Sequence, residues 1–117
     1  MTSVVNVKVN NLRPKYKDLK EWHDDKNNVY IGRKGIVFID GKRYPEHDSI
    51  WCNPYKIGKD GNRDQVLEKY KKYITDKLND DDMKKQLCEL KDKCLGCWCK
   101  PDKCHGDILL DLIKKSN

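Results

Sequence analysis

The chain has 117 residues, of which 38% are charged and 37% hydrophobic, so it is long enough for one domain with a single modest core. No apolar run approaches the roughly 20 residues of a membrane-spanning helix, and the first residues lack a signal-peptide pattern. We therefore expect one intracellular domain over residues 1–117, whose six cysteines are thiols, metal ligands or catalytic groups and not disulfides.

The net charge of +6 favours anionic partners such as nucleotides or nucleic acid. Lysines alternate with aspartates along the chain, however, as they do on an ordinary solvated surface. The sequence has no basic stripe and no known nucleic-acid-binding motif that would indicate a surface dedicated to duplex nucleic acid. A nucleotide is therefore the partner we expect first, and nucleic acid the second.

Stretches rich in β-branched residues predict strands in the first half of the chain: residues 4–9, residues 29–33, and a hairpin of residues 36–39 and 42–44. Asp40-Gly41 suits a tight turn at the tip of that hairpin. We expect a short helix around residues 19–22. Residues 51–55 form a compact loop, because Pro54 forces Asn53 out of helical geometry.

The second half of the chain has helical patterns. Asn62 is a good N-cap, and Gln65 three residues later completes a variant of the capping box. The helix that follows has apolar residues spaced at three and four: Val66, Leu67, Tyr70, Tyr73, Ile74 and Leu78. A second helix over residues 83–91, a cysteine-rich strand and a last helix over residues 108–115 complete the chain. This order predicts an α/β domain, three-layered, with a partly parallel sheet.

Residues 94–107 hold four of the six cysteines and one histidine, a density that suggests a site. Side chains alternate faces along a strand, so Cys97 and Cys99 share one face and can converge. Together with Cys104 and His105 they form a set of donors that suits tetrahedral zinc. Two features count against zinc: Cys-x-Cys spacing is less common than Cys-x2-4-Cys, and adjacent residues such as Cys104 and His105 rarely point at one metal.

Two other interpretations stay open beside zinc. If Asp107 is the N-cap of the last helix, Cys104 and His105 lie just before a helix N-terminus, which favours a thiolate with histidine as proton carrier, or a bound phosphate. Alternatively, the cysteines are small buried hydrophobic residues beside a core tryptophan, an interpretation that fits Cys88 and Cys94 best.

The motif Leu-Gly-Cys-Trp-Cys-Lys-Pro of residues 95–101, followed by Cys-His-Gly-Asp at residues 104–107, resembles the hallmark of domain of unknown function 4326. This small family occurs in phages, giant viruses and some bacteria. Residues 30–33 and 51–55 match it in the same order, so the resemblance covers nearly the whole chain. It implies a compact α/β domain near the Rossmann-like nucleotide-binding folds, with the three motifs meeting at one site. It supplies no reaction.

If the three motifs share a pocket, further residues become candidates for ligand binding. Arg33 is then a candidate anion clamp, Asn53 a hydrogen-bonding group, and Trp51 or Tyr55 a stacking surface for a base. Each has a structural alternative: Arg33 as a surface charge, Asn53 bonded within its own turn, and the aromatic residues as core.

We therefore expect a small intracellular domain, of viral type, that binds or processes a nucleotide or another phosphate-bearing ligand. The four Cys and His residues serve as zinc ligands or in thiol chemistry, with Cys104, His105 and Asp107 as the candidate catalytic groups. The competing class is a non-enzymatic module, stapled by zinc, whose surface binds nucleic acid or protein. A closed site with four ligands indicates a structural role, whereas three ligands and a water indicate catalysis.

Overall fold

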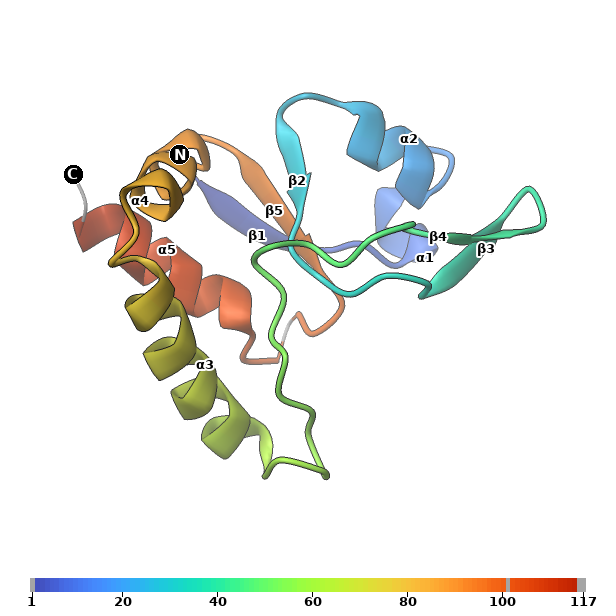
Figure 1. Ribbon diagram of the computed structural model, residues 1–117. Helices are drawn as coiled ribbons and strands as arrows, with labels where there is room; N and C mark the ends of the chain where they lie inside the picture. Colours follow the sequence, from blue (N-terminus) through green and yellow to red (C-terminus); the bar gives the residue numbers. More distant parts are fainter. Residues whose placement is uncertain (1, 101, 116–117) are drawn as a thin grey trace.

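The computed structural model describes residues 2–100 and 102–115, and its centre is a parallel sheet of three strands (Figure 1). The interior strand is β5 (Cys94–Cys97), with β1 (Ser3–Asn6) on one side and β2 (Asn28–Tyr30) on the other. Both neighbours run parallel to β5. The predicted α/β class and parallel strands are therefore confirmed.

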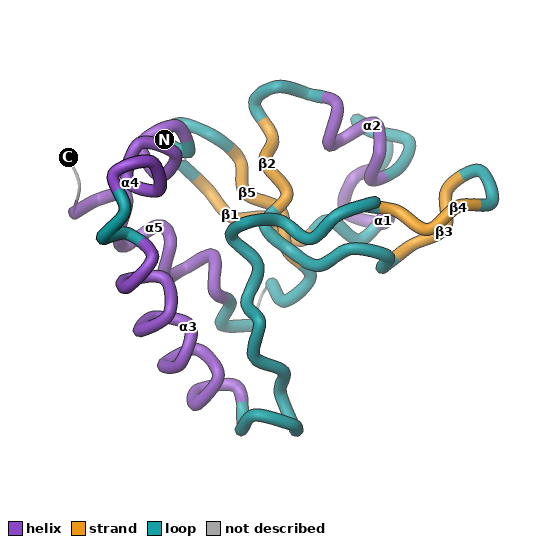
Figure 2. The backbone as a smooth tube through the Cα atoms, viewed as in Figure 1, coloured by secondary structure: helices purple, strands orange, loops and turns teal. Residues whose placement is uncertain are grey.

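Both faces of this sheet are covered, which gives the predicted three layers (Figure 2). One face carries α3 (Arg63–Lys77), α4 (Asp81–Glu89) and α5 (His105–Lys115). The other carries the short helices α1 (Val9–Leu12) and α2 (Leu19–Asp24), with the hairpin of β3 (Val37–Ile39) and β4 (Lys42–Tyr44). None of the described helices is long and apolar enough to cross a membrane.

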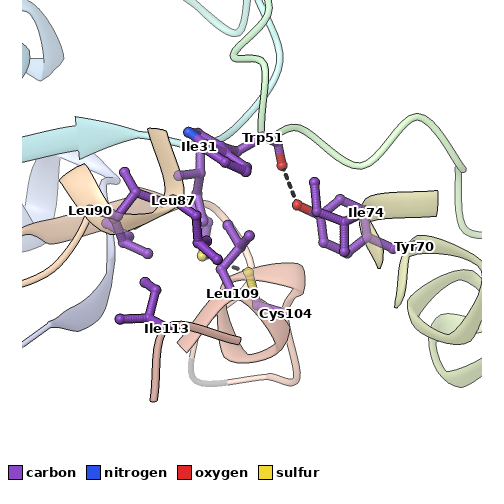
Figure 3. Close-up of a cluster of buried hydrophobic side chains, with 11 residues drawn as sticks. Ile31, Trp51, Tyr70, Ile74, Leu87, Leu90, Cys104, Leu109 and Ile113 are labelled. Carbon is purple, nitrogen blue, oxygen red and sulfur yellow. Dashed lines mark hydrogen bonds between the residues drawn. The ribbon is translucent and has the colours of Figure 1, made fainter. Parts of the chain in front are cut away.

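The side chains of β5 alternate between the two faces of the sheet, so this strand contributes to the hydrophobic core on each face. Leu95 and Cys97 pack with the helices α3 to α5, in the core that Figure 3 shows, whereas Cys94 packs with α1 and α2. Gly96 lies where Trp22 of α2 presses on the sheet. A Cβ atom at Gly96 would lie 2.3 Å from Trp22 Cη2 and 2.6 Å from Val7 Cγ1, so only glycine fits this contact.

The predicted helices over the second half of the chain are present. The capping box of Asn62 and Gln65 is formed, and Val66, Tyr70 and Ile74 of α3 are buried. Figure 3 shows the Tyr70 hydroxyl donating to the carbonyl of Trp51, at 2.7 Å. Leu87 of α4 is buried as expected.

Two predictions in these elements are wrong. Cys88 is exposed on α4 and is not a core residue. The first strand ends at Asn6, and residues 9–12 are helical. The reason is the Asn6 side chain, whose Oδ1 accepts from the Lys8 amide at 2.9 Å and whose Nδ2 donates to the Lys100 carbonyl at 2.6 Å. This turn directs the chain away from the sheet.

The predicted hairpin forms a separate sheet of two antiparallel strands. Asp40 and Gly41 at its tip both have positive φ, at 53° and 79°, as a tight hairpin turn requires. Hydrogen bonds from the Gly35 amide to the Pro45 carbonyl and from the Ser49 amide to the Gly32 carbonyl close its base.

The contact at Gly96 predicts a large effect of a single methyl group. Gly96→Ala should lower the free energy of unfolding by about 1–3 kcal/mol, because Trp22 and Val7 are both buried and must shift. Urea titration followed by tryptophan fluorescence measures the change. The control, Cys88→Ala on exposed α4, should stay within about 0.5 kcal/mol of the wild type. Equal stability of both variants would contradict this packing.

Candidate functional site

A pocket of about 550 Å³ opens beyond the carboxyl ends of β5 and β2, the edge at which open α/β sheets bind ligands. It brings together all three segments singled out in the sequence. Its wall contains Arg33 from the segment after β2, Asn53 and Tyr55 from the loop, and the Cys97 to His105 region. The described residues that line it include no aspartate or glutamate.

Three thiols form one cluster at this pocket. The Sγ atoms of Cys97 and Cys104 are 2.9 Å apart, with Cys104 as donor, and Cys99 packs against the same core at the pocket wall. Cys97 and Cys104 are each only 1% exposed, whereas Cys99 is half-buried. Cys97 is the last residue of β5 and Cys99 follows two residues later, so alternation places both on the side that α5 approaches.

The last helix begins at His105, three residues earlier than predicted. Asp107 is therefore not the N-cap but the third residue of the helix. Its Oδ2 accepts from the Cys104 amide at 3.2 Å, its other oxygen pairs with the Lys100 ammonium, and it does not line the pocket. Cys104 is the residue before the helix, and its sulfur accepts from the Gly106 amide at 3.4 Å. A thiol thus occupies the position where a Ser or Asp side chain usually caps a helix.

His105 is buried, with 8% exposure, and its tautomer follows from its contacts. Nε2 lies 2.6 Å from the Ile31 carbonyl oxygen. Because a carbonyl only accepts, Nε2 carries the hydrogen, and Nδ1 presents a lone pair 3.6 Å from the Cys104 sulfur. Burial lowers the pKa of His105, so the ring stays neutral. It is placed to accept a proton from a thiol.

Interactions within the cluster give its thiols different pKa values. The neighbouring Cys104 and Cys97 thiols, followed by the Arg63 guanidinium, favour the thiolate of Cys99 and lower its pKa. The pKa of Cys104 is raised in turn, because Cys97, Cys99 and burial all favour its protonated form. Of the three thiols, Cys99, the most accessible, therefore has the lowest pKa.

Four cationic side chains line the pocket: Arg33, Lys56, Arg63 and Lys103. Arg63 donates to the Lys103 carbonyl at 2.9 Å and lies 3.8 Å from the Asp102 carboxylate, while Lys103 lies 3.5 Å from Asp64. These pairs are solvent-exposed and therefore weak. Lys56, Arg63 and Lys103 were not predicted from the sequence as lining residues. Arg63 had a usable signal, since it is the first residue after the predicted N-cap, Asn62.

The loop residues have mainly structural contacts. Arg33 donates to the carbonyls of Asn53, at 2.8 Å, and Tyr55, at 2.9 Å, and so holds the loop against the end of β2. Asn53 Oδ1 accepts from the Tyr55 amide at 2.9 Å, within its own turn. Trp51 is a core residue, 3% exposed, and does not line the pocket. Tyr55 does line it, with its ring edge-on to Tyr73.

The predicted zinc ligands provide suitable donor atoms but unsuitable spacing. Two thiolates bound to one tetrahedral zinc at about 2.3 Å lie about 3.8 Å apart, whereas Cys97 and Cys104 are closer, at 2.9 Å. Within residues 2–100 and 102–115, no group of three or more His, Cys, Asp or Glu side chains is arranged to hold a metal ion. This arrangement does not fit a bound zinc, and the zinc site stays a prediction.

The fold and the site together define a small three-layer α/β domain with a basic, thiol-lined pocket at the carboxyl edge of its sheet. The chain belongs to the family described as "Domain of unknown function (DUF4326)", which matches residues 15–115. The resemblance inferred from the cysteine motif is thereby confirmed.

Two viral proteins are similar to this chain. It is 39% identical over 94 residues to "Uncharacterized protein R718" of Acanthamoeba polyphaga mimivirus, which covers 74% of this chain and 66% of the relative. It is 36% identical over 69 residues to "Uncharacterized 12.4 kDa protein in nrdA-td intergenic region" of Enterobacteria phage T4, covering 57% and 62%. The match therefore spans just under two thirds of each relative. No solved structure is significantly similar to this chain.

The neutral state of His105 predicts how stability depends on pH. Its pKa is lowered in the fold, so below the unfolded value of about 6.5 the unfolded chain binds a proton there that the folded protein does not. The contribution of neutral His105 to stability is therefore fully present above that pH. It is lost as the pH falls, by up to about 1.4 kcal/mol per pH unit. In denaturant titrations the wild type should lose stability relative to His105→Gln on acidification. Parallel pH profiles would show that His105 is not held neutral.

Proposed function

We propose that this domain binds a nucleotide, or another small phosphate-bearing molecule, in the pocket at the carboxyl edge of its sheet. The observation that carries the proposal is the charge of that pocket: four cationic side chains and no carboxylate among the described lining residues. A cleft lined by one sign of charge concentrates ligands of the opposite sign. Its volume, about 550 Å³, is within the range of small-molecule sites.

Two helices begin at the wall of this pocket. Arg63 begins α3, and Cys104 precedes α5, and both residues line the pocket. The free amide groups and partial positive charge of a helix N-terminus favour a phosphate. We therefore assign the phosphate end of the ligand to the region between Arg63, Lys103 and the start of α5.

The rest of the lining is apolar and suits the base of a nucleotide. Ile36 and Ile57 are 47% and 53% exposed, unusually high for isoleucine, and both line the pocket with Tyr55. Aromatic and apolar side chains beside a few polar groups are typical of small-molecule sites. A planar base would cover these residues while its phosphate meets the basic end.

The thiol cluster gives the same pocket a means of processing its ligand. Cys99 supplies a nucleophilic sulfur at the pocket wall, and His105 Nδ1 supplies a proton acceptor beside Cys104. We place the domain in an intracellular, reducing compartment, where its six free cysteines remain thiols.

Ligand binding is tested by thermal stabilisation with nucleoside mono-, di- and triphosphates, and by inorganic phosphate alone. We expect nucleotides to raise the melting temperature. Arg63→Gln and Lys103→Gln should each weaken binding about tenfold, since each removes a charged hydrogen-bond donor.

The matched control is Lys84→Gln, an exposed lysine of α4 outside the pocket, which should bind like the wild type. If no nucleotide stabilises the protein, or if Arg63→Gln binds as well as Lys84→Gln, the proposal is wrong.

A second candidate is a zinc-stapled module that binds nucleic acid or protein. The types of donor atom favour it, three thiols and the lone pair of His105 Nδ1, although the Cys97 and Cys104 sulfurs would have to move apart to hold the metal. Its histidine already donates Nε2–H to a backbone carbonyl, as metal-bound histidines do.

Metal analysis under reducing conditions separates the two candidates. We expect protein without stoichiometric zinc, six thiols open to titration in denaturant, and faster alkylation of Cys99 than of exposed Cys88 in the folded protein. One zinc per chain, with Cys97, Cys99 and Cys104 protected until a chelator is added, would instead establish the zinc module.

A further inference from the structure

The proposed phosphate binding does not involve the contact between the Cys97 and Cys104 sulfurs. The two residues belong to different elements, the end of β5 and the start of α5, and their Sγ atoms are 2.9 Å apart. Cys99 follows Cys97 by two residues, packs against the same core and lines the same pocket. The other three cysteines, Cys52, Cys88 and Cys94, take no part in this cluster.

Accessibility differs among the three clustered sulfurs. Cys97 and Cys104 also line the pocket but are almost completely buried, so their sulfurs offer little surface to a reagent. Cys99 is half-buried and lines the pocket that opens to solvent. An oxidant that enters this pocket therefore meets Cys99 first, with two further thiols within reach of its sulfur.

We propose that Cys97 and Cys104 form a redox-active dithiol, oxidised to a disulfide by a hydroperoxide that reacts first at Cys99. The inference stands on the packing of the sulfurs and does not depend on whether the pocket binds a phosphate. In a reducing compartment such disulfides are transient and serve catalysis or redox sensing.

The proposed reaction has three steps. The Cys99 sulfur attacks an oxygen of hydrogen peroxide, the O–O bond breaks, and sulfenic acid and water form. The Cys104 sulfur then attacks the Cys99 sulfur, the S–O bond breaks, and a second water leaves, with His105 Nδ1 taking the Cys104 proton and passing it to that oxygen. Finally, the Cys97 sulfur attacks Cys104 and releases Cys99 as a thiol. Two thiols thereby lose two electrons and two protons, and the peroxide becomes two waters.

The test treats the folded, full-length protein with one equivalent of hydrogen peroxide after removal of reductant. Trypsin cuts after Lys93 and Lys103, which separates Cys104 from Cys97 and Cys99, and fragmentation of the linked peptides then identifies the partner of Cys104. We expect the thiol count to fall from six to four, the mass to fall by about 2 Da, and a Cys97–Cys104 disulfide that dithiothreitol reverses.

Three variants assign the order of the steps. Cys99→Ser should slow oxidation at least about tenfold. Cys97→Ser should stop at a Cys99–Cys104 disulfide, whereas Cys88→Ser, which changes an exposed thiol of α4, should behave as the wild type. Thermal unfolding verifies that each variant is folded. The peptide map of the wild type tests the predicted Cys97–Cys104 disulfide even if a variant does not fold.

The proposal is overturned if Cys99 is oxidised no faster than Cys88, or if it proceeds to sulfinic acid without a disulfide. It is equally overturned if the wild type retains a Cys99–Cys104 bond, or if bound zinc keeps the three thiols unreactive. Nucleotide binding by the reduced protein is measured separately, so that either proposal can fail without the other.

Discussion

Hydrogen bonding on both edges of β5 is the constraint on which the rest of the domain depends. A sheet of three strands has one interior strand, and here it is the cysteine strand, paired in parallel with β1 and β2. A shift by one residue would exchange its two faces and move Leu95 and Cys97 out of their core. Trp22, packed against Gly96, opposes such a shift from the other face. The register of one strand therefore determines where the thiols lie.

Backbone carbonyls hold the remaining walls of the pocket. His105 is bonded to the carbonyl of Ile31, which joins the start of α5 to the end of β2, and Arg33 is bonded to two carbonyls of the loop that follows the hairpin. These bonds orient the side chains in the free protein, so that binding of the proposed ligand would cost less entropy. They also leave the positive charge of Arg33 without a carboxylate partner among the described residues. An anion would complete this arrangement.

Local interactions were predictable from the sequence, and long-range ones were not. The capping box of α3 involves residues three positions apart, so its pattern is visible in the chain. The start of α5 was misplaced because Asp107 suits both a cap and the third helical position, while a thiol in the capping position has no common signature. The early end of the first strand depends on a bond from Asn6 to Lys100, 94 residues away. Only tertiary packing determines that Lys103 faces a pocket, whereas most other lysines face solvent.

The closed base of the β3–β4 hairpin separates its tip from the rest of the molecule. The chain leaves and rejoins the domain at points that hydrogen bonds hold together, so residues added between Asp40 and Gly41 need not disturb either core. The entropic cost of a longer flexible loop grows only slowly, by about 0.6 kcal/mol for each doubling of its length. The tip is therefore a suitable position for an inserted epitope or fluorescent reporter, with which the protein could be followed in living cells.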